Sequence, residues 1–369
     1  MTSISCVKIT DIDKELRKLL EESKELGKIR ACLFNLIVYT QNKRRVESFK
    51  DILSAVVQKF PCRILFIQYE KQSTEDFLNV TVSSEGFDDG KTSFTCDQIT
   101  IEVGGQHIER VPFLVTPHIV PDLPIYLLWG EDPTVEKQVL PNFESYASRL
   151  IFDVECTKNL QEFSKNMLKK IDTLNYDIRD ISWGLTGPWR DVMAQVFNSP
   201  EHIDQLKKAK SLLIEYNQFE VEHIHCCEMQ SIYLQAWLAA EFGWELKEVD
   251  RVEGEVNLNY QSEGGDLKVI LRPKVCRELI SGAILGIEVS DANITKYELK
   301  RAESLRKVIV HISTLNECLL PFALPLPNLV HGSNFMKEIF YETTSQHYRN
   351  MLQQLAITNW NSIRTTNDR

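Results

Sequence analysis

Two short apolar runs on either side of an amphipathic stretch constrain the fold of this chain more than any other feature of its sequence. Residues 32–39 and 63–69 have the length of strands and are rich in branched and aromatic side chains. Between them, apolar residues recur at helical spacing over residues 46–56. A strand, a helix and a strand joined by short links predict a right-handed parallel crossover, because two parallel strands need such a connection. We therefore predict an α/β fold for the first part of the chain.

Further segments extend this predicted sheet. Residues 78–83 and 98–103 alternate apolar and polar side chains, which predicts antiparallel strands, and residues 125–129 form an apolar run typical of a buried strand. A helix is expected over residues 133–147. We predict that this first domain takes residues 1–157 and contains a mixed, mainly parallel sheet.

The second half of the chain has a different pattern. Residues 252–313 contain four or five alternating segments, which predict a mostly antiparallel sheet, and helices are expected over residues 221–241 and 334–355. At 369 residues the chain also exceeds the size at which a single core stops growing, about 250–300 residues. We therefore predict a second, α+β domain over residues 158–369.

Charge and composition limit the classes of partner. The formal net charge of −10 argues against a general nucleic-acid binder, which needs basic surface to neutralise phosphates, and it disfavours an anionic membrane. The longest uncharged stretch, residues 318–336, is interrupted by three prolines, so we expect no membrane-spanning helix there. The nine cysteines are odd in number and contain no CxxC pair, which favours reduced thiols over a disulfide framework. No secretory signal is apparent, so we expect a soluble cytoplasmic protein.

No catalytic motif stands out in the sequence. Residues 86–92 read GFDDGKT, but three residues separate the glycines where a phosphate loop needs four, and two aspartates would repel phosphate. A hairpin turn is the favoured interpretation. The dinucleotide fingerprint GxGxxG is also missing after the first predicted strand. The sequence therefore offers no convincing catalytic set, and we expect no cofactor.

His223, His225, Cys226 and Cys227 form the one cluster that resembles a set of metal ligands. On a helix, His223 and Cys227 would share a face, which permits a two-point site. No second pair with ligand spacing lies near it, and Cys227 belongs to an apolar strip, so we favour packing and predict no metal. A redox switch between Cys226 and Cys227 stays open as an alternative.

Cys62 is a second thiol of interest, because the neighbouring Lys59 and Arg63 could lower its pKa. A nucleophile also needs a positioned base, and His107 or His118 could serve only if the fold brought one of them close. A cysteine at the start of a buried strand is the favoured interpretation.

The segment PDLPIYLLW at residues 121–129 is more distinctive. Pro121 and Pro124 keep the chain extended, because each disfavours helix in the residue before it. The chain then runs into an apolar strand that ends in Trp129. Asp122 and Trp129 are thus expected near opposite ends of one strand, where one end could border a cleft. A central strand with a rigid leading loop is the structural alternative.

The segment DISWGLTGPWRD at residues 180–191 contains two indoles, two glycines, a proline and an arginine. Pro188 suits the first turn of a helix, where its missing N–H costs nothing, and Gly187 could be the N-cap. Apolar residues follow Trp189 at helical spacing, so this ring is expected to be half buried. We therefore predict that a helix begins near Pro188.

Trp183 precedes that predicted helix, in a loop flanked by glycines that can present the ring outward. Tryptophan and arginine are enriched at interaction hot spots, so Trp183, Trp189 and Arg190 are candidates for a protein contact. Backbone donors at the helix start, together with Arg190, could instead hold an anion such as a sugar phosphate. Purely structural packing is the third interpretation.

Five segments stand out when they are taken in order: RACLFNLIVY at residues 30–39, PCRIL at 61–65, PDLPIYLLW at 121–129, SRLIFD at 148–153 and WGLTGPWR at 183–190. Together they resemble the bacterial glucose-6-phosphate dehydrogenase assembly proteins of the OpcA family. LQAWL at residues 234–238, with FGW at 242–244, is similar to the family's later helix and its aromatic end. The resemblance covers residues 29–244, and the order and spacing of the segments make it fairly specific.

The resemblance implies a non-catalytic partner of glucose-6-phosphate dehydrogenase that favours the active oligomer of this enzyme in the oxidative pentose phosphate pathway. We expect a small set of residues to form or support the contact with the dehydrogenase. They are Asp122, Trp129, Trp183, Pro188, Trp189 and Arg190. The alternative is a sugar-phosphate-binding sensor or enzyme that uses the helix start at residues 188–190.

Overall fold

The computed structural model describes most of the chain and divides it into two compact units. The described residues are 5–41, 43–88, 93–135, 139–173, 177–219, 227–291, 295–304, 306–326, 344–358 and 360. The first unit takes the described residues of Met1–Thr157 and Thr173–Ile181, and the second takes those of Lys158–Asp172, Ser182–Val330 and Thr344–Arg369. The domain limits of 1–157 and 158–369 stay a prediction.

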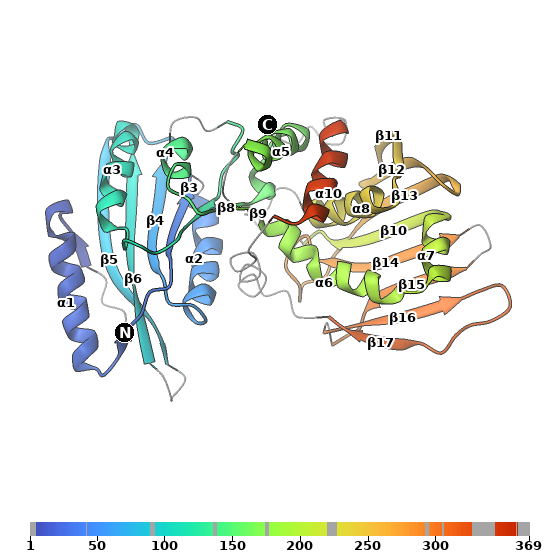
Figure 1. Ribbon diagram of the computed structural model, residues 1–369, viewed down its shortest axis with the longest axis horizontal. Coiled ribbons are helices and arrows are strands. Elements are labelled where there is room, and N and C mark those ends of the chain that lie inside the picture. The colour runs from blue at the N-terminus through green and yellow to red at the C-terminus, as the bar shows by residue number, and fades with distance from the viewer. Residues whose placement is uncertain are drawn as a thin grey trace. The chain divides into compact units, whose positions relative to one another are not determined.

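The described part of the first unit contains a nine-stranded sheet with the order β1-β5-β6-β4-β3-β7-β8-β9, in which β2 also pairs with β6 (Figure 1). The strands are β1 (Ser5–Val7), β2 (Ile29–Arg30), β3 (Asn35–Thr40), β4 (Arg63–Glu70), β5 (Phe77–Asp88), β6 (Ser93–Gly104), β7 (Ile125–Trp129), β8 (Arg149–Phe152) and β9 (Asp177–Asp180). The neighbours from β6 through β4, β3, β7 and β8 to β9 pair in parallel, whereas β5 pairs antiparallel with β6 and β1. The prediction of a mixed, mainly parallel sheet is confirmed.

The predicted crossover is confirmed inside this sheet. β3 and β4 are parallel neighbours, and α2 (Lys43–Val57) connects them along the chain and contacts both. Phe49, Leu53 and Val56 of α2 are buried, as is every residue of β3. Burying a side chain of this size contributes about 1.5–3 kcal/mol, so the apolar stripe of α2 stabilises the crossover.

The helix predicted over residues 133–147 is wrong in its extent. Within that range the structure has only the short helix α4 (Leu140–Glu144), and residues 136–138 lie outside the described chain. The first unit also contains the helices α1 (Ile12–Glu25) and α3 (Val111–Val115). The carboxylate of Asp132 accepts hydrogen bonds from the backbone N–H of Thr134 at 2.9 Å and from its hydroxyl at 2.6 Å. Such side-chain bonds offer the backbone an alternative to a helix, which explains the turn at this point.

The described part of the second unit contains an eight-stranded sheet with the order β11-β12-β13-β10-β14-β15-β16-β17 (Figure 1). The strands are β10 (Ala209–Asn217), β11 (Glu245–Val252), β12 (Glu255–Ser262), β13 (Gly265–Lys274), β14 (Ile284–Asp291), β15 (Lys296–Arg301), β16 (Lys307–Ser313) and β17 (Phe322–Pro325). The pair β10–β13 is parallel, and the other neighbours are antiparallel. The prediction of a mostly antiparallel sheet is confirmed, and with it the predicted fold class.

Helices accompany this second sheet. They are α5 (Leu160–Thr173), α6 (Ile181–Val196), α7 (Pro200–Lys207), α8 (Met229–Phe242) and α10 (Gln346–Ile357). α8 and α10 pack side by side (Figure 1). The helix predicted over residues 221–241 corresponds to α8, and the one over 334–355 to α10, although residues 220–226 and 327–343 lie outside the described chain.

β9 is a strand that the sequence patterns did not indicate. Its four residues read DIRD, so three of them are charged, yet Arg179 and Asp180 are buried. Arg149 of β8 donates to the carboxylate of Asp177 at 2.9 Å across the parallel pair. Ion pairing between strands thus replaces the apolar contacts from which a strand is usually recognised.

Among the residues that the structure describes, no helix combines the length and the apolar character needed to cross a bilayer.

Candidate functional site

The segment of residues 180–191 forms a helix rather than an exposed loop followed by a helix. α6 begins at Ile181, so the prediction that the helix begins near Pro188 is wrong. Pro188 lies inside α6, where a proline lacks the N–H for the helix ladder and crowds the carbonyl four residues earlier. The helix persists because it is buried on nearly all sides: Leu185 is 2% exposed and Trp189 is fully buried.

Trp183 is also buried, at 5% exposure, so the prediction that a loop presents this ring outward is wrong. The guanidinium carbon of Arg190 lies 3.3 Å from the centroid of the Trp183 ring, and the Tyr348 ring lies 5.5 Å away on another helix. Arg301 approaches Trp189 in a similar way, with its guanidinium carbon 5.7 Å from the ring centroid. Cation–π contacts of this kind stabilise a packed arrangement.

The predicted anion site at residues 188–190 depended on a helix start there. Because α6 begins seven residues before Pro188, the backbone N–H groups that follow this proline belong to the helix interior and point into the helix ladder. Backbone N–H groups of a helix start are therefore not available at residues 188–190 to bind a sugar phosphate. Arg190 itself is half buried and packs on Trp183.

Asp122 and Trp129 lie at opposite ends of the β7 region, in the first unit. Asp122 is exposed and has a φ of 63°, a left-handed conformation that aspartate tolerates better than most residues. Trp129 is fully buried and stacks on Tyr39 of β3, with the ring centroids 4.1 Å apart and the planes 7° from parallel. Trp129 is therefore a core residue, whereas Asp122 is accessible.

A buried asparagine sets the shape of the loop that carries Asp122. The side-chain oxygen of Asn35 accepts a hydrogen bond from the N–H of Val120 at 2.8 Å, and its amide donates to the Val120 carbonyl at 3.0 Å. The Asn35 amide also lies 3.4 Å from the carbonyl of Leu123. A fully buried side chain on β3 thus ties the loop to the sheet.

The carboxyl ends of β3, β7 and β8 carry an ionic cluster that the sequence patterns did not indicate. Arg45 of α2 contacts the Asp153 carboxylate through Nη2 and the Cys156 sulfur through Nη1, and lies 3.9 Å from Glu155. Glu131 accepts hydrogen bonds from the Gln41 backbone at 2.6 Å and from the Thr40 hydroxyl at 3.2 Å. Lys43, Glu131 and Asp153 each lie within three residues of a strand end, so charged residues that closely follow strands were the available sequence signal.

Burial dominates the electrostatics of this cluster. Burial, and then the charge of Asp153, raise the pKa of Glu155 to about 8, although Arg45 opposes the change. Burial also raises the pKa of Cys156 well above its ordinary value, so this side chain is a thiol, which donates to the Gly130 carbonyl at 2.9 Å. Burial would lower the pKa of Arg45, but the surrounding negative charges, led by Asp153, outweigh it and raise that pKa. The cluster therefore combines a permanent positive charge with a carboxyl group that holds its proton at neutral pH.

The edge of the sheet at the carboxyl ends of its parallel strands is where doubly wound α/β proteins bind nucleotides, usually over a glycine-rich turn after the first strand. The sequence from the last residue of β3 into the first turn of α2 reads TQNKRR and contains no glycine. Gly130, after β7, has a packing role: a Cβ there would lie 2.4 Å from the Phe49 ring and 2.9 Å from the Tyr39 carbonyl oxygen. The residues at this edge thus favour packing and ion pairing over a pyrophosphate cradle.

The thiol predictions have different outcomes. Burial raises the pKa of Cys62 well above its ordinary value, so the idea that nearby positive charges lower it is wrong. Of the four residues that resemble metal ligands, for which packing was the favoured interpretation, His223, His225 and Cys226 lie outside the described residues. The Cys227 sulfur accepts a hydrogen bond from the Ser281 hydroxyl at 2.9 Å. In the described ranges, no group of three or more potential ligands is arranged to hold a metal ion.

Comparison with known protein families shows to which family the chain belongs. Residues 54–169 match a family model described as the glucose-6-phosphate dehydrogenase subunit N-terminal domain, and residues 176–320 match the corresponding C-terminal domain. Together the two matches take up more than half of the 369 residues. The chain belongs to the OpcA family.

Curated relatives from cyanobacteria agree with this assignment. The chain is 23% identical over 206 residues to a protein of Synechococcus elongatus, a match that covers 55% of this chain and 42% of the relative. A protein of Synechocystis sp. is 22% identical over 200 residues, which covers 52% of this chain and 39% of the relative. Both carry the name OxPP cycle protein OpcA. The matches span less than half the length of either relative.

Two solved structures of similar fold are oxidoreductases. The 3-ketoreductase KijD10 from Actinomadura kijaniata, in complex with TDP-benzene and NADP, has a TM-score of 0.52 and 10% sequence identity, and the match covers 92% of this chain and 97% of that chain. An oxidoreductase from Bacillus cereus has a TM-score of 0.49 and 7% identity, and the match covers 88% of this chain and 94% of that one. At such low identity, the likeness of the OpcA-family chain to KijD10 concerns the fold alone.

Proposed function

We propose that this OpcA-family chain binds glucose-6-phosphate dehydrogenase as a non-catalytic, cytoplasmic partner and favours the active oligomer of that enzyme. The observation that carries the proposal is the match of both halves of the chain to domains described as subunit domains of the dehydrogenase. A partner shifts such an equilibrium only by its differential affinity for the two states. The chain would therefore bind the active oligomer more tightly than the inactive form.

Burial divides the six predicted contact residues into two roles under this proposal. Asp122 is exposed, so its carboxylate can reach a partner directly. Arg190 is half buried and its Nη1 is fully buried, so it can reach a partner only through the remaining part of its side chain. Trp129, Trp183, Pro188 and Trp189 are buried and would support the contact by holding the surrounding surface in place. A fully buried ring has no surface to offer a partner unless the fold rearranges.

Co-purification of the full chain with the dehydrogenase of the same organism tests the proposal. We expect a complex of defined mass in light scattering, and a higher dehydrogenase activity with the chain than without it. Unchanged mass and unchanged kinetics of the dehydrogenase would refute the proposal.

Matched charge variants locate the contact. Asp122→Asn keeps a residue that tolerates positive φ and should weaken binding by about threefold to tenfold, the range for a charge near an interface rim. Asp51→Asn, an exposed change on α2, is the control in the same unit. Arg190→Gln and the exposed Arg277→Gln form the corresponding pair in the second unit. Equal affinities for each variant and its control would show that Asp122 and Arg190 lie outside the interface.

A further inference from the structure

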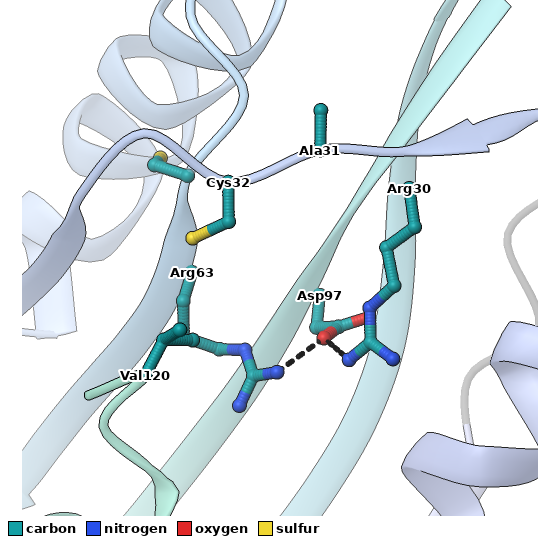
Figure 2. A pocket seen from close by; sticks show the side chains of 7 residues that line it. Arg30, Ala31, Cys32, Arg63, Asp97 and Val120 are labelled. Carbon is teal, nitrogen blue, oxygen red and sulfur yellow. Dashed lines mark hydrogen bonds and ion pairs between the residues drawn. The ribbon is translucent and has the colours of Figure 1, made fainter. Parts of the chain in front are cut away.

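Three charged residues that are distant in the sequence meet at the amino-terminal edge of the parallel sheet. Arg30 lies on β2, Arg63 begins β4, and Asp97 lies on β6 between them. The register explains the meeting, because Arg30 pairs with Thr95 and Ile64 pairs with Gln98 on the shared neighbour β6. Figure 2 shows the two guanidinium groups approaching the carboxylate from two sides.

Both arginines use the same carboxylate oxygen. Nη2 of Arg63 donates to Oδ2 of Asp97 at 2.6 Å, and Nη2 of Arg30 contacts the same atom. Nη1 of Arg63 donates to the His118 carbonyl at 2.9 Å. The side chain of Arg63 is 11% exposed and that of Asp97 is 6% exposed. A buried guanidinium group, that of Arg63, and a half-buried one, that of Arg30, thus share one acceptor atom, although each presents five N–H donors.

Two adjoining cavities open onto these guanidinium groups. One, of about 290 Å³, is lined by Arg30, Arg63 and Asp97 together with Cys32, Cys62 and neighbouring backbone. The other, of about 430 Å³, is lined by the same two arginines and by residues of α1 and the 117–121 loop. Its charged and titratable lining residues are Asp13, Arg17, Arg30, Arg63 and His118. Small-molecule sites have volumes of about 300–1,000 Å³, so the cavities are of a suitable size.

The charges around the cavities do not balance. The guanidinium groups of Arg30 and Arg63 face one buried carboxylate, that of Asp97, in a chain whose overall net charge is −10. Arg17 and Asp13, which also line the larger cavity, are exposed. Burial, and then repulsion from Arg30, lower the pKa of Arg63 to about 10. Burial likewise lowers the pKa of His118, so its imidazole adds no positive charge at neutral pH. A local excess of desolvated positive charge is stabilised by an added anion.

We propose that these adjoining cavities bind the phosphate group of a small metabolite. Arginine donors come from three elements, α1, β2 and β4, and such a spread suits a tetrahedral phosphate better than a planar carboxylate, which one guanidinium satisfies in bidentate fashion. The combined space exceeds what a phosphate ion alone fills. The Asn35 hydrogen bonds to Val120 fix the loop that forms one wall.

Thiol chemistry does not account for this site. Burial raises the pKa of Cys32 and, much more, that of Cys62, so both side chains are neutral thiols and weak nucleophiles. The competing explanation is a purely structural ion bridge that ties β2, β4 and β6 together. The two explanations differ in one measurable property, because only a ligand site binds an added anion.

Isothermal titration of the full chain at low ionic strength and near-neutral pH tests the proposal. The titrants are inorganic phosphate, glucose 6-phosphate, and gluconate as an unphosphorylated, carboxylate-bearing comparison. We expect phosphate and the phosphate ester to bind and gluconate not to bind. Tighter binding of the ester would identify a phosphorylated metabolite as the ligand, whereas equal binding would identify phosphate itself, and both outcomes support the site.

Arginine variants connect that binding to these cavities. Arg30→Gln and Arg17→Gln each remove a charge-assisted donor, which should weaken phosphate binding by about tenfold or more. Lys24→Gln removes an exposed charge further along α1 and should leave the affinity unchanged. Arg17 is exposed, so its variant is expected to keep the wild-type melting temperature even if Arg30→Gln does not.

Three outcomes would overturn the proposal: no binding of either phosphate compound, equal binding of gluconate, or arginine variants that bind as tightly as Lys24→Gln. The dehydrogenase is absent from these titrations. Their result is therefore independent of whether the chain binds that enzyme.

Discussion

Replacing Glu155 with glutamine should remove a specific part of the pH dependence of folding. The Glu155 side chain is 11% exposed and lies in the cluster with Arg45 and Asp153. Burial raises its folded pKa to about 8 from the ordinary value of 4.5. Between these two values the folded state keeps a proton that the unfolded state has released. Stability therefore falls as the pH rises through this window and levels off above the folded pKa.

The size of the effect follows from linkage. Each pH unit between the two pKa values costs about 1.4 kcal/mol of unfolding free energy. Raising the pH from about 6 to about 8 should thus cost the wild-type protein about 2–3 kcal/mol. Glutamine resembles the protonated carboxyl in shape and has no proton to lose. Below the ordinary pKa of 4.5 the two proteins should differ by less than about 1 kcal/mol. The variant should already be the more stable by about 2 kcal/mol at about pH 6, and its advantage should grow until the pH reaches the folded pKa.

Urea unfolding followed by tryptophan fluorescence, at several pH values across this window, measures the difference. Glu109→Gln is the matched control, because Glu109 is exposed and its replacement should leave the wild-type pH dependence intact. Parallel curves for the wild type and Glu155→Gln would refute the reasoning, since they would show that Glu155 ionises without cost in the folded state.

Three further substitutions test the packing. Trp183→Ala should lower the unfolding free energy by about 3–5 kcal/mol in urea titrations, because the ring is buried. An unchanged stability together with lost activation of the dehydrogenase would instead show that Trp183 is a contact residue. Gly130→Ala should lower the unfolding free energy by about 1–3 kcal/mol and lower the melting temperature, because the new Cβ would lie 2.4 Å from the Phe49 ring. A melting curve like that of the wild type would contradict this packing. Arg149→Met should cost about 3–5 kcal/mol by removing one side of the Arg149–Asp177 ion pair. A neutral result in the same urea assay would show that water or another group replaces the arginine.

The central crossover was predictable because its signal is local. Burial of one helix face or of a whole strand leaves apolar residues at a characteristic spacing, and this spacing is visible without any partner. The run at residues 125–129 coincides with β7, and the stripe at residues 46–56 lies within α2. The order of the motifs also indicated the OpcA family, which the family models confirm.

The helix α6 was mispredicted and the strand β9 was missed, because contacts with neighbouring elements determine the conformation of both. In α6, two glycines and Pro188 predict a break, but burial of Trp183 and Trp189 outweighs these helix-breaking preferences. In β9, charged residues conceal a strand that pairs with β8 and is held by the Arg149–Asp177 ion pair. Both cases depend on contacts between residues from different elements.

The sequence by itself determined the two kinds of sheet, the central crossover and the family, because each of these leaves a periodic or ordered pattern along the chain. Only the tertiary structure decided which side chains are accessible and which charges meet. Arg30, Arg63 and Asp97 come together because parallel pairing aligns three strands in one register, and Glu155 holds a proton because the folded chain removes it from water. Register and desolvation are properties of residues brought together from a distance, so no local pattern records them.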